Sequence, residues 1–415
     1  MMLPAREAAD RLGVKIDTLY AYVSRGLLRS MEVAGSRERH YDVDEIEQFR
    51  AGRGTTRARP PAEDLIPVIG SSICLIDNHR LYYRGVDALT LAETASLEEI
   101  AALLWEEPIP HAGPLPVNGA RERADDLAPR SAGAASAKHA RAEREGKGQV
   151  GLIERCQIRL AELAGTDHAA LDLSRAGVAR TGRAIVAELA ACVGGQEPSP
   201  QPIHEQLATS WKLDAIGADL VRRCLVLLAD HELNASTFVA RCIASTGATP
   251  YAVVSGALAA LSGRRHGGAS ASVEVLACEL AAMPDPMTAM AARVARGDDL
   301  PGLGQPLYPD GDPRAVAILT AARAALPARA GWIAQMADAA TRLTSEHPNV
   351  DFGLGITAAA LGLPRGAALC LFLVARSVGW IAHAIEQYES GVLIRPRARY
   401  IGERRISQPD ASSAD

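Results

Sequence analysis

Four short polar segments interrupt the apolar second half of this 415-residue chain, and they hold side chains that can do acid–base chemistry. They are LADHELNASTFVARCIAST (228–246), LSGRRHGGASASVEVL (261–276), PGLGQPLYPDGDPRA (301–315) and HPNVDFGLG (347–355). A carboxylate can take up a weakly acidic proton, a histidine can donate to an oxygen that gains charge, and arginines can hold carboxylates with paired hydrogen bonds. Each segment alone is ambiguous, because a histidine before two glycines is equally typical of a helix end.

The composition of the chain limits the scaffold that positions these segments. The chain is 48% hydrophobic and 22% charged, which is ordinary for a globular protein and excludes wholesale disorder. It has only 4 Phe, 4 Trp and 9 Tyr, so we expect a core of Leu, Val, Ile and Ala. Long Ala/Leu segments punctuated by Gly and Pro predict closely packed helices rather than a β-sandwich. The formal net charge of −5 shows that the chain as a whole is no nucleic-acid polycation.

The cysteines and the apolar runs favour a cytoplasmic protein. The seven cysteines form no C-x-x-C pair, which argues against a disulfide framework or a thiolate metal site and for a reducing compartment. The first residues, MMLPAREAADRLG, contain no apolar run typical of a signal peptide. The most apolar stretch, 356–385, is interrupted by Pro364, Arg365 and Arg376. We therefore expect no metal, no membrane association and a cytoplasmic location.

Charge and turn residues divide the chain into parts. Four arginines and no acidic residue occur in 50–59, and two prolines follow. This composition predicts a basic linker over 53–64 between a small N-terminal module, 1–52, and a large region, 65–402. Residues 403–415 are expected to form a flexible tail. A second stretch, from residue 106 to about 147, is rich in Pro, Ala, Gly and Arg and is expected to be a surface connection.

The N-terminal module has the pattern of two short helices joined at a glycine. Pro4 suits the first position of a helix that ends before Gly13. A second helix is predicted over about 16–24, and the two together match a helix-turn-helix. Residues 31–41 carry an Ala-Gly-Ser turn between extended arms, as in a wing. Asp42 begins a capping-box pattern that predicts a third helix.

This order of elements resembles the MerR/excisionase type of winged helix-turn-helix DNA-binding domain, through REAADRLGVKIDTLYAYVSRGLL and then SRERHYDVDEI. The resemblance implies DNA contacts that are mostly to phosphates and therefore salt-sensitive. The implied residues are Lys15, Thr18, Tyr20 and Arg25 on or beside the recognition helix, and Arg37 and Arg39 on the wing. The alternative is an inherited interaction module without a DNA target, since residues 1–59 hold 11 basic against 9 acidic residues, a net charge of only +2.

The start of the large region has two local patterns of its own. GSSICLIDNHRLYYRG (70–85) predicts a short hairpin. A helix follows, with Ile100, Leu103 and Leu104 on one face. Ser96 is expected to cap the start of this helix, with Glu99 at the third helical position.

The four polar segments, taken together and in this order, resemble citrate synthase. The four segments match the family motifs H-E-x-N-A-S-T, H-G-G-A, G-x-G followed by Y and D-P-R, and N-V-D. The chain also matches the family's hairpin pattern S-x-I-x-x-I-D…L-x-Y-R-G, its A-R-x-V-G-W and its closing R-P-R. The match covers essentially all of residues 65–402. It implies an all-α citrate synthase fold and a homodimer. It also implies a small domain, over approximately 267–376 and inserted in a large one, that closes over the substrates.

The resemblance implies a Claisen-type condensation of an acyl-CoA, acetyl-CoA above all, with oxaloacetate or a related 2-oxo acid, and no permanently bound cofactor. By motif, Asp351 would be the base that removes a proton from the thioester, and His266 would hold the thioester oxygen as the enol forms. His231 would hydrogen-bond the oxo acid. The structural alternatives are a helix-cap aspartate at 351 and a buried core histidine at 231.

The same resemblance assigns residues to the anionic groups of the substrates. Arginine suits a dicarboxylate because it can form two parallel hydrogen bonds with each carboxylate. The implied residues are Arg314, Arg376 and Arg395 for the dicarboxylate, the backbone around Gly302 and Gly304 for coenzyme A, and Arg264 and Arg265 as candidate phosphate partners. In the family the last of the three dicarboxylate arginines reaches across the dimer, so the active site would be shared. Each could instead be a surface ion-pair residue, but Arg376 lies inside an apolar helix.

One residue departs from the family pattern at a catalytic position. Where the family has the histidine of G-x-G-H, this chain has Gln305. A glutamine amide can donate a hydrogen bond to the ketone, but it cannot give up a proton to the new alkoxide. General acid catalysis is worth about 10²–10⁴-fold, so we expect reduced or altered activity. HGGAS also departs from the commoner HGGAN-E continuation.

Three functions therefore compete. The first, which we favour, is an acyltransferase of the citrate or 2-methylcitrate synthase type with a winged-helix appendage. The second is a transcriptional regulator in which a pseudo-citrate synthase senses an oxo acid or acyl-CoA and controls DNA binding. The third is a degenerate paralogue without a ligand role. The presence of Asp351 counts against the third, because a protein that only binds ligands has less need of a carbanion base.

Overall fold

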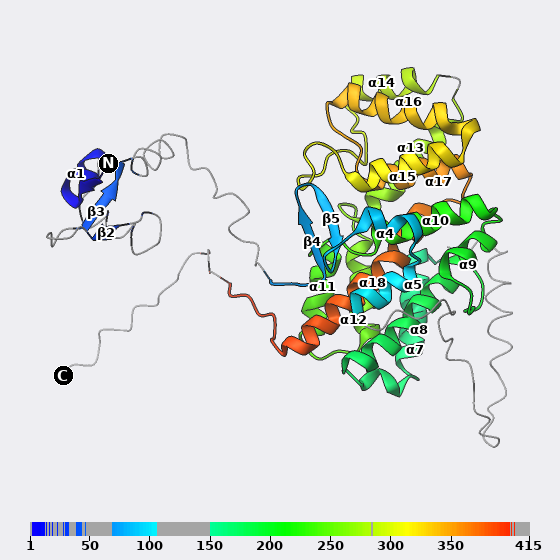
Figure 1. Cartoon of the computed structure of the whole chain (residues 1–415), viewed down its shortest axis with the longest axis horizontal. Coiled ribbons are helices and arrows are strands. Elements are labelled where there is room, and N and C mark those ends of the chain that lie inside the picture. The colour runs from blue at the N-terminus through cyan, green and yellow to red at the C-terminus, as the bar shows by residue number, and fades with distance from the viewer. Residues whose placement is uncertain are drawn as a thin grey trace, which may run out of the picture. The chain divides into compact units, whose positions relative to one another are not determined.

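The computed structural model describes residues 2–12, 14, 16, 19, 23, 28, 30–32, 39–43, 46, 69–105, 150–283, 285–398, 400 and 402. The chain divides into two compact units, Met1–Gly70 and Ser71–Asp415, each with its own hydrophobic core (Figure 1). The linker predicted over 53–64, the surface connection predicted over 106–147 and the tail predicted over 403–415 lie outside the described residues.

The N-terminal unit contains a three-stranded antiparallel sheet and a helix. β1 (Met2–Pro4) pairs with β3 (Arg39–Asp42), and β3 also pairs with β2 (Met31–Glu32). Helix α1 (Ala5–Leu12) follows β1 directly. The prediction that Pro4 begins the helix is therefore wrong by one place. Pro4 instead ends an edge strand, where a residue without a backbone N–H is tolerated.

The apolar core of this unit combines residues of the first helix, the predicted second helix and the sheet. It consists of Leu3, Ala5, Ala8, Ala9, Leu12, Leu19, Leu28, Tyr41 and Ile46. The paired strands β2 and β3 form the extended arms predicted for the wing, whereas the turn between them, 33–38, lies outside the described residues. The core thus joins the first helix, the second predicted helix, the wing and the start of the third predicted helix.

The second unit opens with the predicted hairpin. β4 (Cys74–Asp77) and β5 (Arg80–Tyr83) pair antiparallel through a two-residue turn. The turn residues, Asn78 and His79, have φ of 48° and 59°, which a tight hairpin turn of this length requires. A short third strand, β6 (Val86–Asp87), pairs with β5.

Two helices follow the hairpin, α4 (Ala88–Thr94) and α5 (Leu97–Trp105). The capping box predicted at the second of them is confirmed. The backbone N–H of Ser96 donates to Glu99 Oε2 at 2.7 Å, and the backbone N–H of Glu99 donates to Ser96 Oγ at 3.2 Å. Each side chain therefore satisfies a backbone donor at the helix start.

The remainder of the second unit is helical, as the composition predicts. Its helices are α7 (Leu152–Ala164), the short 3-10 helix η2 (His168–Leu171), α8 (Arg175–Gly194), α9 (Ile203–Ser210), α10 (Ala215–Leu228), α11 (Ala235–Ala244), α12 (Pro250–Leu261), α13 (Gly267–Ala281), α14 (Pro286–Ala295), α15 (Pro313–Ala325), α16 (Pro327–Thr344), α17 (Val350–Leu361) and α18 (Ala367–Ser390).

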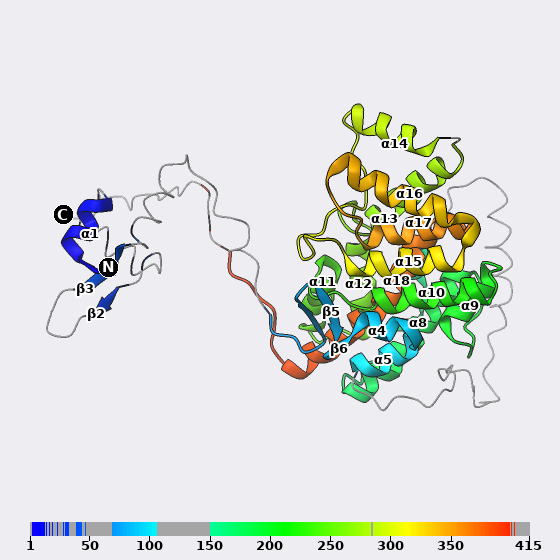
Figure 2. The ribbon, with the colours of Figure 1, turned by 45° about the horizontal axis from the view of Figure 1, so that its top comes forward.

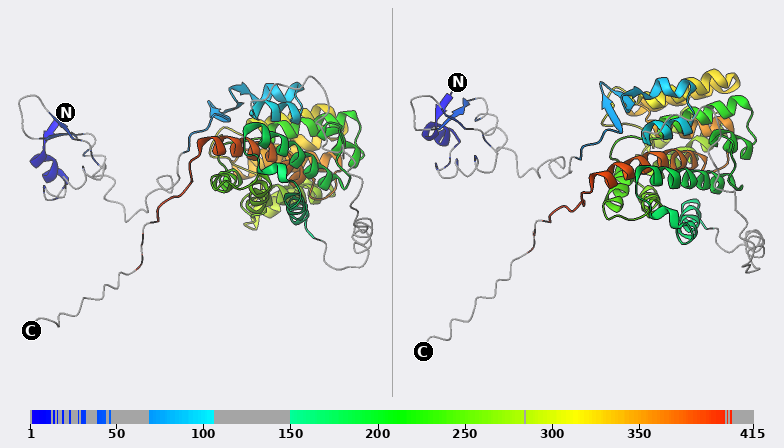
Figure 3. Two further views of the ribbon diagram at one scale, coloured as in Figure 1. Left: turned by 90° about the horizontal axis from the view of Figure 1, so that it is seen from below. Right: turned by 60° about the horizontal axis from the view of Figure 1, so that its bottom comes forward.

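The helices of this unit build two hydrophobic clusters. The larger one surrounds α18, which packs against α5, α8, α10, α11 and α12 and runs through the middle of the unit (Figure 3). The smaller one joins α13, α14, α15, α16 and α17, and Figures 1 and 2 show these helices gathered at one end of the unit. The members of the smaller cluster are residue 220 and residues that lie within 273–361. The limits predicted for an inserted small domain, 267–376, stay a prediction.

The most apolar stretch of the sequence forms two helices rather than one. Helix α17 ends before Gly362 (φ 68°), and α18 begins after Gly366 (φ 88°), with Pro364 between them. Among the helices that the structure describes, α18 is long and apolar enough to cross a membrane by length and composition alone. However, 94% of its most apolar window is buried inside the protein, which is typical of a core helix.

Candidate active site

The four polar segments lie where helices begin. The residues at these starts are Asn234 (α11), His266 (α13), Asp312 (α15) and Asn349 (α17). Three of the four accept hydrogen bonds from backbone N–H groups of the helix that follows. Helix starts leave backbone donors unpaired, so polar side chains are stable there even inside a protein. His266, Arg314 and Asp351 thus lie at the starts of helices, which fix their positions.

His231 follows α10 and is 7% exposed. Its Nε2 lies 3.1 Å from Tyr308 Oη, and the ring of Tyr308 lies 5.7 Å from the guanidinium carbon of Arg314. Burial, with the positive charges of Arg314 and Arg376, holds the pKa of His231 well below its usual value. The imidazole is therefore neutral at physiological pH and acts as a hydrogen-bonding group.

Helix α18 approaches the segment that carries His231 very closely at Gly379. A Cβ atom at this position would collide with the carbonyl oxygen of Ala229 and with the side chain of Asp230. Asp230 is itself fixed by His383 of α18, whose Nε2 lies 3.4 Å from the carboxylate. Both side chains are fully buried. This contact between α10 and α18 sets the position of the neighbouring histidine at 231.

Arg314, at the start of α15, is buried and held by a two-point pair with Asp312. Its Nε donates to Asp312 Oδ1 at 3.0 Å and its Nη2 to Oδ2 at 2.7 Å. Asp312 Oδ2 also accepts from the backbone N–H of Val350, at 3.0 Å. The pair therefore ties the start of α15 to the start of α17. In the part of the chain that the structure describes, Nη1 of Arg314 makes no hydrogen bond and can bind a ligand.

Arg376 is a buried arginine in the middle of α18, 1% exposed. Its Nε donates to the carbonyl oxygen of Leu228 at 2.8 Å, and its guanidinium carbon lies 4.7 Å from the centre of the Phe372 ring. Within the described residues, Nη1 is buried without a hydrogen-bond partner. Burial lowers the pKa of Arg376. A buried, unsatisfied guanidinium nitrogen costs free energy that an anionic ligand can recover.

Asp351 is the second residue of α17. The side chain of Asn349 accepts the backbone N–H of Asp351 at 3.0 Å, and Ser270 Oγ donates to Asp351 Oδ1. Burial raises the pKa of Asp351, while the Ser270 hydrogen bond and the charge of Arg314 act in the opposite direction. Ser270 therefore orients the carboxylate, Asn349 fixes the backbone that carries it, and burial makes it more basic than an exposed aspartate.

His266 stands directly before α13. Its Nε2 lies 2.7 Å from Ser236 Oγ, which also accepts from Trp380 Nε1 at 3.2 Å. The ring meets Phe372 edge-on, with the centroids 5.6 Å apart. Burial, with the charge of Arg376, lowers the pKa of His266 to about 4. This histidine is neutral at physiological pH and can donate to an oxygen without carrying a charge of its own.

These contacts form two groups of predicted residues, and the charge of Arg376, which acts on His231, His266 and Asp351, links the two groups into one site. Tyr308 joins His231 to Arg314, and Asp312 joins Arg314 to the helix start that carries Asp351. Phe372 stands between His266 and Arg376. The site thus contains one buried base, two neutral imidazoles and two buried cations. This combination can remove a proton from a carbon acid, hold the resulting oxyanion and bind a dianion.

The loop before α15 packs tightly against the site. Gly302 and Gly304 have φ of 81° and 69°. A Cβ atom at Gly302 would lie 2.6 Å from Val273 and 2.9 Å from the backbone nitrogen of Phe352, so only glycine fits there. The backbone N–H of Asn349 donates to the carbonyl oxygen of Gly302 at 2.9 Å. The loop is therefore fixed to the segment that immediately precedes Asp351.

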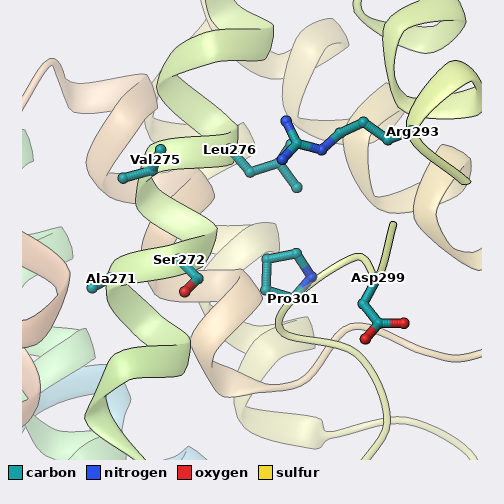
Figure 4. Close-up of a pocket in the computed structure, with 7 residues that line it drawn as sticks. All are labelled: Ala271, Ser272, Val275, Leu276, Arg293, Asp299 and Pro301. Carbon is teal, nitrogen blue, oxygen red and sulfur yellow. The ribbon is translucent and has the colours of Figure 1, made fainter. Parts of the chain in front are cut away.

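Two pockets lie along this loop. One, of about 440 Å³, is lined by Gln305 and Tyr308 on one side and by Glu346 and His347 on the other. In the described chain, the amide of Gln305 makes no side-chain hydrogen bond. The other pocket, of about 530 Å³, lies between α13, α14 and Pro301 (Figure 4). Its lining residues are Ala271, Ser272, Val275, Leu276, Arg293, Asp299 and Pro301.

Comparison with known sequences decides the family. The family described as citrate synthase, C-terminal domain, matches residues 64–397, and the family described as MerR HTH family regulatory protein matches residues 3–54. The chain belongs to the citrate synthase family. The first match covers most of the chain and contains all the buried residues of the site, whereas the second covers the N-terminal unit.

Relatives in the citrate synthase family carry two activities in their names. Citrate synthase 2 of Bacillus subtilis (strain 168) is 29% identical over 360 residues, which are 80% of this chain and 93% of the relative. A 2-methylcitrate synthase of Mycobacterium tuberculosis (strain ATCC 25618 / H37Rv) is 29% identical over 357 residues, 79% of this chain and 86% of the relative. The equal identities do not separate the two activities.

Solved structures confirm the predicted all-α citrate synthase fold. Citrate synthase from Thermotoga maritima MSB8 is 25% identical and has a TM-score of 0.63, covering 84% of this chain and 98% of its own. Citrate synthase from Thermoplasma acidophilum, solved with carboxymethyl coenzyme A and oxaloacetate, is 21% identical with a TM-score of 0.63. It covers 85% of this chain and 100% of its own.

Several residues predicted from the family resemblance lie apart from the site. Arg395 is exposed beyond the end of α18, and no contact joins it to the other site arginines among the described residues. Arg264 and Arg265 are exposed in the turn before His266. In the N-terminal unit, Arg39 lies on β3 and donates to Ser30 Oγ at 2.9 Å. The other predicted DNA-binding residues, Lys15, Thr18, Tyr20, Arg25 and Arg37, lie outside the described residues.

The structure adds residues that the family motifs contained but that sequence reasoning did not assign. They are Ser236, which contacts His266, Trp380, which contacts Ser236, Tyr308, which contacts His231, and Ser270, which contacts Asp351. The last of these occupies the position where the chain departs from the family's HGGAN-E. Because of this departure, a serine hydroxyl donates to the carboxylate of Asp351, which therefore still has a hydrogen-bond partner.

Proposed function

We propose that this citrate synthase family protein is an acyltransferase that condenses acetyl-CoA, or another acyl-CoA, with oxaloacetate or a related 2-oxo acid. We further propose that Gln305 reduces or alters this activity. The observation that best supports condensation is the convergence of Asp351, His266, His231, Arg314 and Arg376 in one buried site. Coenzyme A is released as product, and the chemistry needs no other cofactor.

The first step is proton removal from the carbon next to the thioester. Asp351 takes the proton, Ser270 orients its carboxylate, and Asn349 holds its backbone N–H. His266 donates to the thioester oxygen as that oxygen gains enol character. This role requires the proton of His266 on Nδ1, and the hydroxyl proton of Ser236 must then turn from Asn234 Oδ1 to Nε2. A neutral donor matches a weakly basic enol oxygen better than an imidazolium would.

The second step joins the enol carbon to the ketone carbon of the oxo acid. Arg314 and Arg376 each offer a nitrogen to the carboxylates, while His231, held by Tyr308, donates to the oxo acid. Gln305 offers an amide donor where the family has an acid. Water then cleaves the new thioester, which gives the tricarboxylate and free coenzyme A. The backbone of the Gly302 and Gly304 loop is our candidate contact for coenzyme A.

We also propose a homodimer with a shared active site, in a cytoplasmic setting. Arg395 is exposed after α18 in a single chain, so it is available to complete the dicarboxylate site of a second copy. The chain then contributes two buried arginines to its own site and one exposed arginine to its neighbour's. Sedimentation analysis of the full chain tests the dimer, and a monomer at micromolar concentration would contradict it.

The direct test of the proposed reaction is thiol release. Full-length protein is incubated with acetyl-CoA or propionyl-CoA, with and without oxaloacetate, and free thiol is followed with a chromogenic disulfide. We expect release that depends on the oxo acid. If neither acyl-CoA is cleaved although calorimetry shows oxaloacetate binding, the catalytic proposal fails and ligand sensing remains.

The pH dependence of kcat/KM should show a single acidic limb. Below its folded pKa Asp351 is protonated and cannot act as a base, and burial places this pKa above the ordinary aspartate value of 3.8. The rate should therefore rise with pH through that value and then level off. The lowered pKa values of His231 and His266 predict no inflection near 6.5. A pH–rate profile in buffers of constant ionic strength checks this, and a clear inflection at 6.5 would contradict it.

Replacement of Arg376 by lysine should weaken oxo-acid binding. Arg376→Lys keeps the charge but loses the planar fork and the bond to Leu228, so we expect KM for oxaloacetate to rise about 10–100-fold. The matched control is Arg223→Lys, which changes a surface ion pair with Asp219 and should stay within about twofold. Circular dichroism of both variants verifies folding. An unchanged KM in the first variant would remove Arg376 from the binding site.

A second candidate function is a ligand-sensing DNA-binding regulator. The match of residues 3–54 to the MerR family and the absence of a catalytic acid at Gln305 favour it. Fluorescence anisotropy with duplexes selected from a random pool measures DNA binding and its salt dependence. A change in DNA affinity on addition of oxaloacetate or acetyl-CoA would support sensing. DNA affinity that is indifferent to every such ligand would contradict it.

A further inference from the structure

Two cysteines face each other between α7 and α8, away from the residues of the candidate site. Cys156 Sγ and Cys192 Sγ are 3.5 Å apart, although the residues are 36 positions apart in the sequence. Cys156 is buried, whereas Cys192 is partly exposed, and both are free thiols. Among the seven cysteines, all of which fall in the described part of the chain, no other pair of sulfurs is within hydrogen-bonding distance.

The helices that carry this pair are held in register by an ion pair. Arg159 of α7 donates to both carboxylate oxygens of Glu188 of α8, at 3.0 and 3.2 Å. Figure 1 shows the two helices side by side at the lower end of the large unit. The two sulfurs are therefore brought together by a fixed packing of helices rather than by a mobile loop.

The surroundings give the two thiols different reactivity. The hydrogen bond from Cys156, with the charges of Arg155 and Arg159 and against the effect of burial, lowers the pKa of Cys192 to about 7. The same hydrogen bond and burial raise the pKa of Cys156. The thiolate is the nucleophilic form of cysteine, so the more accessible sulfur is also the more reactive one. Its buried neighbour is placed to react second.

We propose that Cys192 and Cys156 form a reversible oxidation site for hydrogen peroxide or a small organic peroxide. Cys192 is the sulfur that meets the peroxide, and Cys156 is the resolving sulfur. This proposal rests on the geometry of the two helices and is independent of the acyltransferase reaction. It agrees with a reducing compartment, in which disulfides are transient and act as redox sensors.

The chemistry balances in two steps. The Cys192 thiolate attacks one oxygen of hydrogen peroxide, the O–O bond breaks, hydroxide leaves and Cys192 becomes a sulfenic acid. The sulfur of Cys156 then attacks that of Cys192, the S–S bond forms and the S–O bond breaks. The hydroxide and the oxygen of the sulfenic acid take up the two thiol protons and leave as two water molecules. The two thiols lose two electrons in total, and the peroxide accepts these two electrons.

The structural change required is small. A disulfide needs the sulfurs at about 2.05 Å, so they must approach by about 1.5 Å from their present separation. Helix α8 also packs against α18, the helix that carries Arg376, so the new bond would join α7 to the framework of the site. Cys370, at the start of α18, is the next sulfur in the neighbourhood, since its charge raises the pKa of Cys156. It is the natural competitor for the resolving role.

The test uses the full-length protein without any variant. Fully reduced protein is treated with one equivalent of hydrogen peroxide, remaining thiols are blocked with N-ethylmaleimide, and peptides are mapped by mass spectrometry. We expect two of the seven thiols to be lost, with a cross-linked peptide that joins Cys156 to Cys192 and disappears on reduction with dithiothreitol. Oxidation spread over all seven cysteines, or a bond between other cysteines, would overturn the proposal.

Two variants separate the roles of the sulfurs. In Cys156→Ser, dimedone should trap a sulfenic acid at Cys192 and no internal disulfide should form. In Cys370→Ser, the disulfide should form as in the native protein; its loss would reassign the resolving sulfur and contradict the proposal. Cys242→Ser is the matched control, because it removes a partly exposed thiol far from this pair in the sequence. Melting curves of the reduced proteins show whether each variant folds.

Discussion

Asp351→Asn should lower kcat for condensation of acetyl-CoA with oxaloacetate by about 10³-fold or more, since general base catalysis is worth about 10²–10⁴-fold. The asparagine oxygen can still accept from Ser270, so the shape and the hydrogen bond are kept. What is lost is the ability to take up a proton. Oxaloacetate affinity, measured by calorimetry, should be nearly unchanged, because Arg314 and Arg376 are intact.

The stability of this variant provides an independent check. Burial raises the pKa of Asp351, so ionising this carboxyl in the folded protein costs folding free energy once the pH exceeds its unfolded pKa. The neutral amide removes that cost, and Asp351→Asn should unfold at the same temperature as the native protein or a higher one. Loss of activity then cannot be ascribed to unfolding.

The matched control changes the partner of the base and keeps the base itself. Ser270→Ala removes the hydroxyl that donates to Asp351, and we expect about a 10-fold loss, the usual effect of one hydrogen bond. The pKa of Asp351 should also rise, which would move the acidic limb of the pH profile upward. If Asp351→Asn keeps more than a tenth of native activity, another group removes the proton and the proposed mechanism is wrong.

The motifs of the sequence were sufficient to select the residues of the candidate site. Asp351, His266 and Arg376 lie in three separate motifs. In the structure, Phe372 contacts both His266 and Arg376, and the charge of Arg376 acts on Asp351. Local rules also predicted the capping box of Ser96 and Glu99, because both partners lie within one helical turn. Such features depend on spacing along the chain, which a single sequence contains.

The supporting contacts could not be predicted in the same way. Trp380 and Ser236 are 144 residues apart, and their hydrogen bond follows only from how α18 packs on α11. The pair Cys156 and Cys192 is a similar case, since nothing in the spacing of scattered cysteines shows which two will meet. Close packing at Gly379 likewise depends on two helices that are distant in sequence. Tertiary packing, rather than local pattern, determines these contacts.

Gln305→His should raise kcat for citrate formation by about 10²-fold, because it restores a group that can both polarise the ketone and protonate the alkoxide. Gln305 lines a pocket with Tyr308, and Tyr308 contacts His231, so a histidine here would face the oxo-acid side of the site. The new side chain, as an imidazolium, could transfer a proton to the alkoxide, whereas the neutral amide cannot act as an acid. The measurement is thiol release from acetyl-CoA under saturating oxaloacetate.

Two further substitutions at the same position separate donation from proton transfer. Gln305→Leu removes both, and we expect its kcat to fall below that of the native protein by about 10²-fold, the value of one oxyanion donor. Gln305→Asn keeps the amide on a shorter side chain, so its kcat should lie between those of the native protein and Gln305→Leu. An ordering of His, Gln, Asn and Leu from fastest to slowest would show that the native amide contributes to catalysis as a donor.

The result for Gln305→His also decides between the two candidate functions. If the native protein is already fast and histidine changes nothing, the proton comes from another group or from water. If the native protein is inactive and histidine creates turnover, every other catalytic group is intact and the site is silenced at one residue. A site that binds both substrates without converting them suits a sensor, because its ligands stay bound while the protein binds DNA.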